Sequence, residues 1–263
     1  MFRKEGIIPL PGDRVEFSVI REDEKTGFIE SIQPRKTQLI RPAVANIDQL
    51  AIIIAAKAPE PDFLLLDKLL VTAAVKGIDP LICINKIDLD ADEIYKEVVN
   101  SYEKTGYPVV AMSSKSGMGI EDFKEKLRGR VTVLAGQSGV GKSTILNNIA
   151  GSWVMKTGDI SQKIERGKHT TRHAELFELN FGGYVVDTPG FSSFELDEIK
   201  AEELQFYYPD FIKYIDGCKF RGCNHIAEPG CRVKEKVSSR NIDNGRYTRY
   251  IQLYNLLKQK KTF

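Results

Sequence analysis

An octapeptide at residues 136–143 has residue types suited to binding phosphate. It is Gly136-Gln137-Ser138-Gly139-Val140-Gly141-Lys142-Ser143, and Thr144 follows it. The glycines would let backbone N–H groups close around phosphate oxygens, and a helix opening here would present its positive end to the same anion. We expect Lys142 to reach the β- and γ-phosphates and Ser143 to bind Mg²⁺. The octapeptide therefore predicts a nucleoside triphosphate site.

Two further segments have the residue types of a guanine site. Asn85-Lys86-Ile87-Asp88 resembles the guanine-reading motif of GTPases. Asp88 would accept from guanine N1 and the 2-amino group, a paired match that adenine cannot make, which disfavours the wrong base by roughly 10⁴. We expect Asn85 and Lys86 to brace this loop and cover the base. Ser113-Ser114-Lys115 resembles the second base-binding motif, in which a backbone N–H meets the guanine carbonyl.

The segment Asp187-Thr188-Pro189-Gly190 supplies the third part of such a site. Asp187 suits the Mg²⁺ shell, usually through water, and the amide of Gly190 is placed to sense the γ-phosphate. Between the octapeptide and Asp187 lies a polar segment that contains His169-Thr170-Thr171. We expect Thr170 or Thr171 to complete the Mg²⁺ shell, as in the mobile loop of a GTPase.

Apolar strands that alternate with amphipathic helices must position these loops. This pattern predicts an α/β fold with a mainly parallel sheet. The expected strands are 49–56, 80–85, 107–112, 131–135, 174–179 and 184–186, and the expected helices are 63–76, 91–105, 119–127, 142–149 and 244–261. Each nucleotide motif follows a strand, so all of them should meet at the carboxyl edge of the sheet.

The order of the motifs is unusual. Most GTPases have the phosphate loop first and the guanine motifs last, whereas here residues 85–88 and 113–115 precede residues 136–143. The GTPase domain is therefore expected to be circularly permuted, which a site built from strand ends allows when the original termini lie close together. As a result, the segment after Asp187 leads directly into the C-terminal region.

A cluster of cysteine and histidine predicts a metal site in that region. Cys218, Cys223, His225 and Cys231 offer three thiolates and one imidazole. Four such ligands form a closed tetrahedral set for one zinc ion, which leaves no position for a reacting water and predicts a structural role. We expect this ion to fix a basic array for contacts with phosphate. The array consists of Lys219, Arg221, Arg232, Lys234 and Lys236, with Phe220 and Tyr247 available for stacking on bases.

Taken together, the permuted order, the Lys168-His169-Thr170-Thr171 loop and the cysteine cluster resemble the ribosome small subunit-dependent GTPases, bacterial assembly factors of the small ribosomal subunit. The resemblance implies zinc at the same four positions and three domains. These are a partial oligonucleotide-binding (OB-like) β-barrel at 1–45, a circularly permuted P-loop GTPase domain at 46–200 and a zinc-binding helical domain at 201–263.

The resemblance also implies a function. We expect a GTP hydrolase that acts late in assembly of the small subunit, contacts its rRNA, is stimulated by the subunit and uses hydrolysis for release. Phe191 stands where many GTPases have a water-positioning glutamine, so we expect His169 to take that role, with His173 as the weaker competitor. The alternative is a GTP-dependent RNA-binding module with little intrinsic hydrolysis.

Composition is consistent with these expectations. The hydrophobic fraction of 42% and the charged fraction of 28% are those of an ordinary globular protein, which excludes disordered and collagen-like classes. No apolar run is long enough for a membrane span, so we expect a cytoplasmic monomer without a membrane partner. Residues 201–263 contain 12 Lys or Arg against 7 Asp or Glu, so this end is the better candidate for binding a polyanion.

Overall fold

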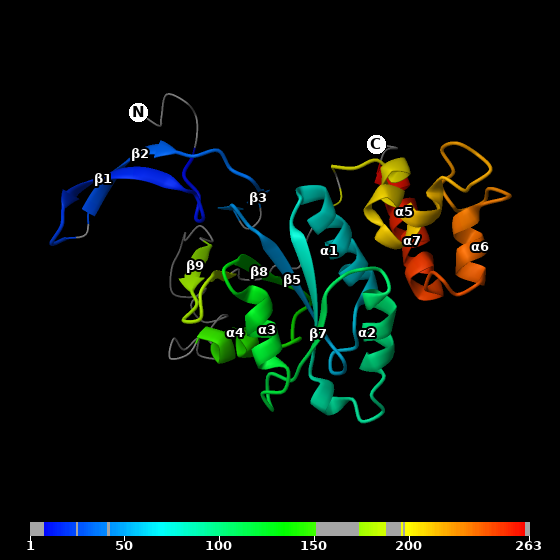
Figure 1. Ribbon diagram of the computed structural model, residues 1–263, viewed down its shortest axis with the longest axis horizontal. Coiled ribbons are helices and arrows are strands. Elements are labelled where there is room, and N and C mark those ends of the chain that lie inside the picture. The colour runs from blue at the N-terminus through cyan, green and yellow to red at the C-terminus, as the bar shows by residue number, and fades with distance from the viewer. Residues whose placement is uncertain are drawn as a thin grey trace.

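A six-stranded sheet forms the centre of the molecule (Figure 1). The computed structural model describes residues 8–24, 26–40, 43–150, 174–187, 196 and 198–260. The strand order is β7-β6-β5-β8-β10-β9, and all neighbours are parallel except the antiparallel pair β10 and β9. The strands are β5 (Gln49–Ala55), β6 (Asp79–Asn85), β7 (Val109–Ala111), β8 (Val131–Ala135), β9 (Glu175–Glu178) and β10 (Tyr184–Asp187). The carboxyl ends of the five parallel strands therefore share one edge.

Helices cover both faces of the sheet, which explains why its strands are apolar on both sides. Along β5, Ile52 and Ile54 belong to one buried cluster and Ile53 to another, as the alternation of a strand requires. The first cluster includes side chains of α1 (Phe63–Lys76) and α2 (Tyr95–Glu103). The second includes side chains of α3 (Ile120–Leu127) and α4 (Lys142–Ala150). The predicted α/β fold is confirmed.

The beginning of α2 differs from the expected helix at 91–105. The helix starts at Tyr95 because the Asp90 carboxylate accepts a hydrogen bond from the Tyr95 amide at 2.8 Å. Glu93, just before it, has a φ of 53° and cannot be part of a right-handed helix. Residues 90–94, three of which are acidic, thus form a turn where the apolar periodicity alone predicted helix.

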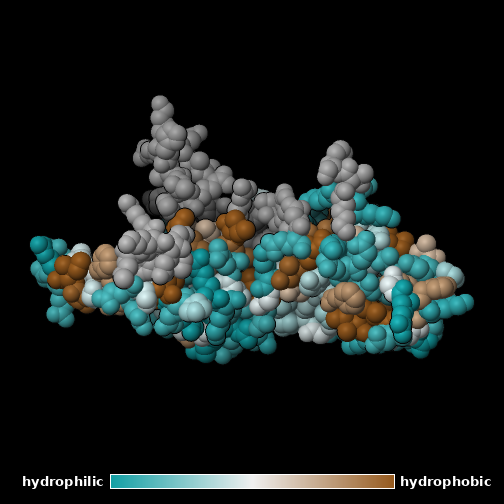
Figure 2. Space-filling view, turned by 90° about the horizontal axis from the view of Figure 1, so that it is seen from above, coloured by the Kyte–Doolittle hydropathy of each residue, from teal (hydrophilic) through white to brown (hydrophobic). Residues whose placement is uncertain are grey.

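The N-terminal part consists of two small antiparallel sheets. Strands β1 (Val15–Arg21) and β2 (Thr26–Ile32) form a hairpin, and β3 (Gln38–Ile40) pairs with β4 (Ala43–Ala45). The hairpin projects from one end of the elongated molecule (Figure 1). Its Phe17 and Phe28 are 63% and 54% exposed, and Figure 2 shows apolar surface at that end. The described strands are thus short of a closed barrel.

The C-terminal part is helical and packs on α1. It contains the 3₁₀ helix η3 (Ala201–Tyr207), α5 (Pro209–Ile215), α6 (Arg232–Ser238) and α7 (Asn244–Lys260). Its buried cluster joins Tyr208, Phe211 and Tyr250 to Val71 of α1. The predicted helix at 244–261 is confirmed. Within the described ranges, no helix has the length and apolar character that crossing a bilayer requires.

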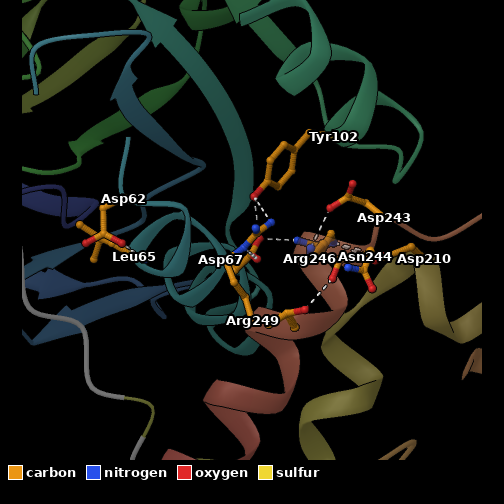
Figure 3. Close-up of polar contacts among 10 residues, drawn as sticks. Asp62, Leu65, Asp67, Tyr102, Asp210, Asp243, Asn244, Arg246 and Arg249 are labelled. Carbon is orange, nitrogen blue, oxygen red and sulfur yellow. Dashed lines mark hydrogen bonds and ion pairs between the residues drawn. The ribbon is translucent and has the colours of Figure 1, made fainter. Parts of the chain in front are cut away.

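A buried ionic network connects the C-terminal part to the central domain (Figure 3). Arg246 of α7 is 1% exposed and donates to Asp67 of α1 at 2.5 Å and to Asp210 of α5 at 3.1 Å. Arg249 donates to the second oxygen of Asp67 at 2.5 Å, and the Tyr102 hydroxyl donates to Asp67 at 2.9 Å. Two arginines and two aspartates balance in charge, and the nearby carboxylates raise the pKa of Arg246 against the opposing effect of burial. The network links four helices at one junction.

Candidate functional site

The predicted phosphate loop, residues 136–143, connects β8 to α4 at the carboxyl edge of the sheet. Gly136 has a φ of 137°, and a Cβ there would lie 2.1 Å from the carbonyl oxygen of Ile53 on the neighbouring strand. Gly141 has a φ of 98°, and a Cβ there would lie 2.4 Å from Nδ2 of Asn85. Both positions therefore need glycine, for a left-handed backbone and for space. The loop leads directly into the N-terminus of α4, the end of a helix that would stabilise an anion.

Lys142 lies across this loop. Its Nζ donates to the carbonyl oxygens of Gly136 at 2.7 Å and Gln137 at 2.8 Å. Burial lowers the pKa of Lys142 from its usual value. Ser138 and Gly139 are exposed, whereas Val140 is buried and anchors the loop. The ammonium therefore lies against the backbone of residues 136–143, and Ser143 and Thr144 are in the first turn of α4. The predicted contact of Lys142 with the β- and γ-phosphates stays a prediction.

Asn85 connects the phosphate loop to the two predicted guanine loops, residues 85–88 and 113–115. Its Nδ2 donates to the carbonyl oxygen of Val140 at 2.8 Å and to Oγ of Ser114 at 3.2 Å. Its Oδ1 accepts from the Ser114 amide at 2.9 Å. Because Asn85 is fully buried, these bonds do not compete with water. Three loops that are far apart in the sequence are therefore fixed relative to one another by a single amide.

Asp88 is presented outward from the same edge. It lies on the 3₁₀ helix η2 (Ile87–Leu89) and is exposed, while the buried Ser113 donates its hydroxyl to Asp88 Oδ1 at 2.5 Å. The backbone of Lys86 is left-handed, with a φ of 62°, and its ammonium donates to the carbonyl oxygen of Ala58. Ser113 thus orients the carboxylate that we expect to read guanine, and Lys86 braces the loop beside it.

One residue of this edge was missed by the sequence reasoning. Asn148, in the second turn of α4, donates its Nδ2 to the carbonyl oxygen of Ser114 at 2.5 Å. It fastens the helix of the phosphate loop to the Ser113–Lys115 segment. The only sequence signal is a polar residue six positions after Lys142, which is ordinary for an exposed helix face.

The third part of the predicted nucleotide site is described only at Asp187. This residue ends β10, whose Val186 pairs with Val133 of β8, so its backbone lies beside the strand that enters the phosphate loop. Several predicted residues lie outside the described residues: His169, Thr170, Thr171, His173, Gly190 and Phe191.

The four predicted metal ligands come together in the C-terminal part. The ligand atoms of Cys218, Cys223, His225 and Cys231 all lie within 4.8 Å of one another. The Nδ1 atom of His225 is 3.3 Å from Sγ of Cys231 and 3.6 Å from Sγ of Cys218. Three sulfur atoms and one imidazole nitrogen at this spacing fit a tetrahedral ion. The cluster could therefore hold one metal ion, with zinc the best match to this donor set.

Burial affects the protonation of the cysteine and histidine ligands in opposite directions. Burial, together with the neighbouring cysteines, raises the pKa of Cys223 to about 12, and burial raises the pKa of Cys231. Burial lowers the pKa of His225, which keeps its imidazole neutral and able to bind a cation. Thiols packed this closely would become thiolates once a divalent cation balanced their charge.

The loop that bears His225 is braced by side chains from two directions. The Glu228 carboxylate accepts from the amides of Asn224 and Ile226 at 2.8 and 2.9 Å. The Tyr247 hydroxyl donates to the carbonyl oxygen of His225 at 2.6 Å. Tyr247 therefore supports the loop through its hydroxyl, and its ring is half-buried. Its predicted role in stacking on bases stays a prediction. Phe220 is 45% exposed, with the ammonium of Lys219 5.5 Å from its ring centroid.

The basic residues predicted around the cluster reach its surface to different degrees. Lys219 and Arg221 are exposed. Arg232, Lys234 and Lys236 on α6 are half-buried, and Arg232 forms an ion pair with Glu235 of the same helix. The ammonium of Lys236 lies 5.5 Å from the ring centroid of Tyr214. Positive charge is therefore available around the cluster, strongest on the loop that contains Cys218 and Cys223.

Comparisons with known proteins agree with this arrangement. The family model described as RsgA GTPase matches residues 32–197. A Ruminiclostridium cellulolyticum protein named small ribosomal subunit biogenesis GTPase RsgA is 61% identical over 258 residues, which make up 98% of this chain and 84% of that protein. A protein of the same name from Alkaliphilus metalliredigens is 46% identical over 263 residues, which make up 100% of this chain and 90% of that protein.

Two crystal structures share the fold. YjeQ from Thermotoga maritima gives a TM-score of 0.81 at 39% identity, with 97% of this chain and 87% of that chain covered. YloQ, described as a circularly permuted GTPase, gives a TM-score of 0.81 at 37% identity, with 100% and 85% covered. The permuted order of motifs and the prediction of a GTP hydrolase are confirmed. The chain belongs to the RsgA GTPase family.

Proposed function

We propose that the protein acts late in maturation of the small ribosomal subunit, hydrolysing GTP while bound to the subunit and leaving it afterwards. Relatives at 61% and 46% identity are named for biogenesis of that subunit. The structural observation that carries the proposal is the continuity of the chain after β10. Residues 196 and 198–200 follow the Asp187–Gly190 segment and lead directly into the helical part, which contains the metal ligands and basic residues. We place this work in the cytoplasm and expect a monomer to perform it.

We assign the nucleotide contacts to the three loops at the carboxyl edge. The phosphate loop and Lys142 would bind the phosphates, and Asp88 would read the guanine edge. Ser143 and Asp187 would hold Mg²⁺, with Thr170 or Thr171 completing its shell. Bound Mg²⁺ supplies positive charge that neutralises the phosphate oxygens. The protein's own part is to fix the γ-phosphate in a cradle of amides beside a partly desolvated ammonium.

We assign the positioning of the attacking water to His169. Phe191 cannot hydrogen-bond a water, whereas a neutral imidazole next to Thr170 can. His169 stands at the place in the sequence where GTPases have a switch loop, and in GTPases a partner that orders this loop accelerates hydrolysis. We therefore expect small subunits to accelerate hydrolysis. If His169→Ala hydrolyses GTP as fast as the wild type in the presence of small subunits, this assignment is wrong.

We assign a structural zinc ion to Cys218, Cys223, His225 and Cys231. Bound zinc would hold the loop between α5 and α6 in one conformation. That loop and α6 contain Lys219, Arg221, Arg232, Lys234 and Lys236, which suit contacts with the phosphates of rRNA. The segment 201–263 would then be the docking module, and 46–200 the GTPase domain.

A second function is a GTP-dependent RNA-binding module with little turnover. Phe191 favours it, because the usual water-positioning group is absent. One measurement separates the two functions: GTP turnover alone, with small ribosomal subunits, and with large subunits or tRNA as controls. Selective stimulation by small subunits supports the first function. Binding of small subunits without stimulation supports the second. Equal stimulation by small subunits, large subunits and tRNA would overturn the ribosomal proposal.

A further inference from the structure

The ring of His225 contacts the metal cluster with one nitrogen and a different element with the other. Its Nδ1 faces the sulfur atoms of Cys231 and Cys218. Its Nε2 lies 2.9 Å from Oε1 of Gln205. Gln205 lies on η3, twenty residues earlier in the chain and outside the cysteine-bearing loop. Gln205 is therefore a polar neighbour of the four-ligand cluster, and it contacts the ring nitrogen of His225 that faces away from the sulfur atoms.

The hydrogen bonds of Gln205 determine where the proton on His225 must be. The Nε2 of Gln205 donates to the carbonyl oxygen of Glu202 at 2.9 Å. Since a carbonyl oxygen only accepts, the NH₂ end of the amide must face Glu202, and Oε1 must face His225. Oε1 also only accepts, so His225 must donate through Nε2–H. A neutral imidazole has one such proton, and Nδ1 is therefore left with its lone pair toward the sulfur atoms.

Burial makes this chain of hydrogen bonds strict. Gln205 is 4% exposed and His225 is 0% exposed, so water does not offer either group another partner. The ring is also enclosed: Phe211 meets it edge-on at 6.0 Å between centroids, and Tyr250 lies at 6.5 Å. Neither aromatic ring can replace the lost acceptor if Gln205 is removed.

We propose that Gln205 is a positioning residue of the metal site, which selects the Nε2–H tautomer of His225 and orients Nδ1 as the metal ligand. The proposal rests on the zinc site proposed above. Metal-bound histidines commonly donate their second N–H to an orienting acceptor, and loss of that acceptor weakens metal binding about 10–100-fold. Here an amide oxygen takes the place of the more usual carboxylate or backbone carbonyl.

The location of Gln205 gives the contact a wider consequence. Its helix η3 begins directly after residues 196 and 198–200, which follow the predicted nucleotide segment at 187–190. Leu196 and Leu204 belong to one buried cluster with Val71 of α1, and Glu198 forms an ion pair with Lys76 of α1. A metal ion that fixes His225 would therefore also hold η3, and through it the point where the nucleotide segment enters the C-terminal part.

The test compares zinc affinity in full-length variants by competition with a chromophoric chelator. Gln205→Met keeps the length of the side chain and removes the acceptor, so we expect affinity to fall about 10–100-fold. Gln205→Glu loses the hydrogen bond to the carbonyl oxygen of Glu202 but keeps an acceptor toward His225. It should stay within about threefold of the wild type, a difference of about 0.7 kcal/mol. Gln252→Met, at an exposed position of α7, is the matched control and should bind as the wild type does.

Ring ¹⁵N spectra of His225 provide a readout that packing alone would not change. In the zinc-loaded wild type we expect a slowly exchanging Nε2–H, and in Gln205→Met a rapidly exchanging one. If the wild type takes up no zinc, the proposed zinc site fails. If the wild type binds zinc and Gln205→Met binds it equally well, Gln205 has no positioning role and the zinc site stands. Equal losses in Gln205→Met and Gln205→Glu would also overturn the proposal, because they would indicate a packing defect.

Discussion

The two candidate sites of this protein are built by different means. At the carboxyl edge of the sheet, loops are cross-linked by neutral amide and hydroxyl groups, above all Asn85 and Ser113, which lie at the ends of buried strands. In the C-terminal part, loops and helices are positioned by four potential metal ligands and a buried ionic network and not by a sheet. The nucleotide site therefore has its scaffold before any ligand arrives, whereas the C-terminal part depends on charged groups finding their partners.

Removal of the metal should separate the two regions most strongly. We expect a chelator, or Cys223→Ser, to unfold the C-terminal part, because a structural zinc ion contributes about 10–16 kcal/mol in small zinc-dependent folds. Guanine nucleotide binding should persist, since the loops at 85–88, 113–115 and 136–143 are anchored to the sheet and to one another. Thermal unfolding and GDP affinity, measured on the same samples, check this. Loss of GDP binding together with the metal would contradict the independence of the two sites.

Removal of the Asp88 carboxylate should affect only the sheet edge. Asp88→Ala is expected to abolish most of the preference for GTP over ATP, a loss of roughly 10⁴ in relative affinity if the paired bonds to guanine are made in a buried site. Zinc content should not change, and stability should fall by no more than about 1 kcal/mol, because the exposed Asp88 side chain loses only its hydrogen bond from Ser113. Asp92→Ala, at a nearby exposed carboxylate, is the control. Competition between labelled GDP and unlabelled nucleotides measures the effect.

The ionic network offers a test of the contact between the regions. Arg246→Met would leave Asp67 and Asp210 buried beside only one remaining cation, Arg249 (Figure 3). Breaking a buried pair in this way costs about 3–5 kcal/mol. We expect that loss in the free energy of unfolding by urea, with zinc bound throughout. Arg128→Met removes an exposed arginine paired with Glu125 and should cost less than about 1 kcal/mol. Equal effects of the two changes would show that the junction contributes little.

Local signals in the sequence were sufficient for the elements that frame the nucleotide site. The helix at 63–76 and the strand at 131–135 have the predicted bounds, because Asp62 caps the former and an apolar run between polar residues defines the latter. The metal ligands were equally readable, since Cys and His at short spacing have few other uses in a chain of this kind.

Contacts between distant segments could not be predicted in the same way. Asp67 and Arg246 are 179 positions apart, and nothing in the sequence near either residue indicates that the two are partners. Gln205 is one polar residue on a short helix, and its role depends on His225 approaching from another loop. The hydrogen bond from the Tyr247 hydroxyl to the carbonyl oxygen of His225 was not predicted for the same reason, because the two residues meet only in the tertiary structure.

The smallest expected effect asks how tightly the sheet edge is preorganised. Asn148→Ala removes the hydrogen bond from α4 to the carbonyl oxygen of Ser114, a contact of about 1 kcal/mol. The Ser113–Lys115 loop would then be held by the hydrogen bonds of Asn85 with Ser114 and of Ser113 with Asp88, so we expect GDP to dissociate about fivefold faster, with phosphate-loop contacts unchanged. Stopped-flow release of a fluorescent GDP measures this, with Asn100→Ala on the exposed face of α2 as control. Unchanged release from Asn148→Ala would mean that the hydrogen bonds of Asn85 and Ser113 suffice to fix the Ser113–Lys115 loop. The contact from α4 would then contribute nothing to guanine binding.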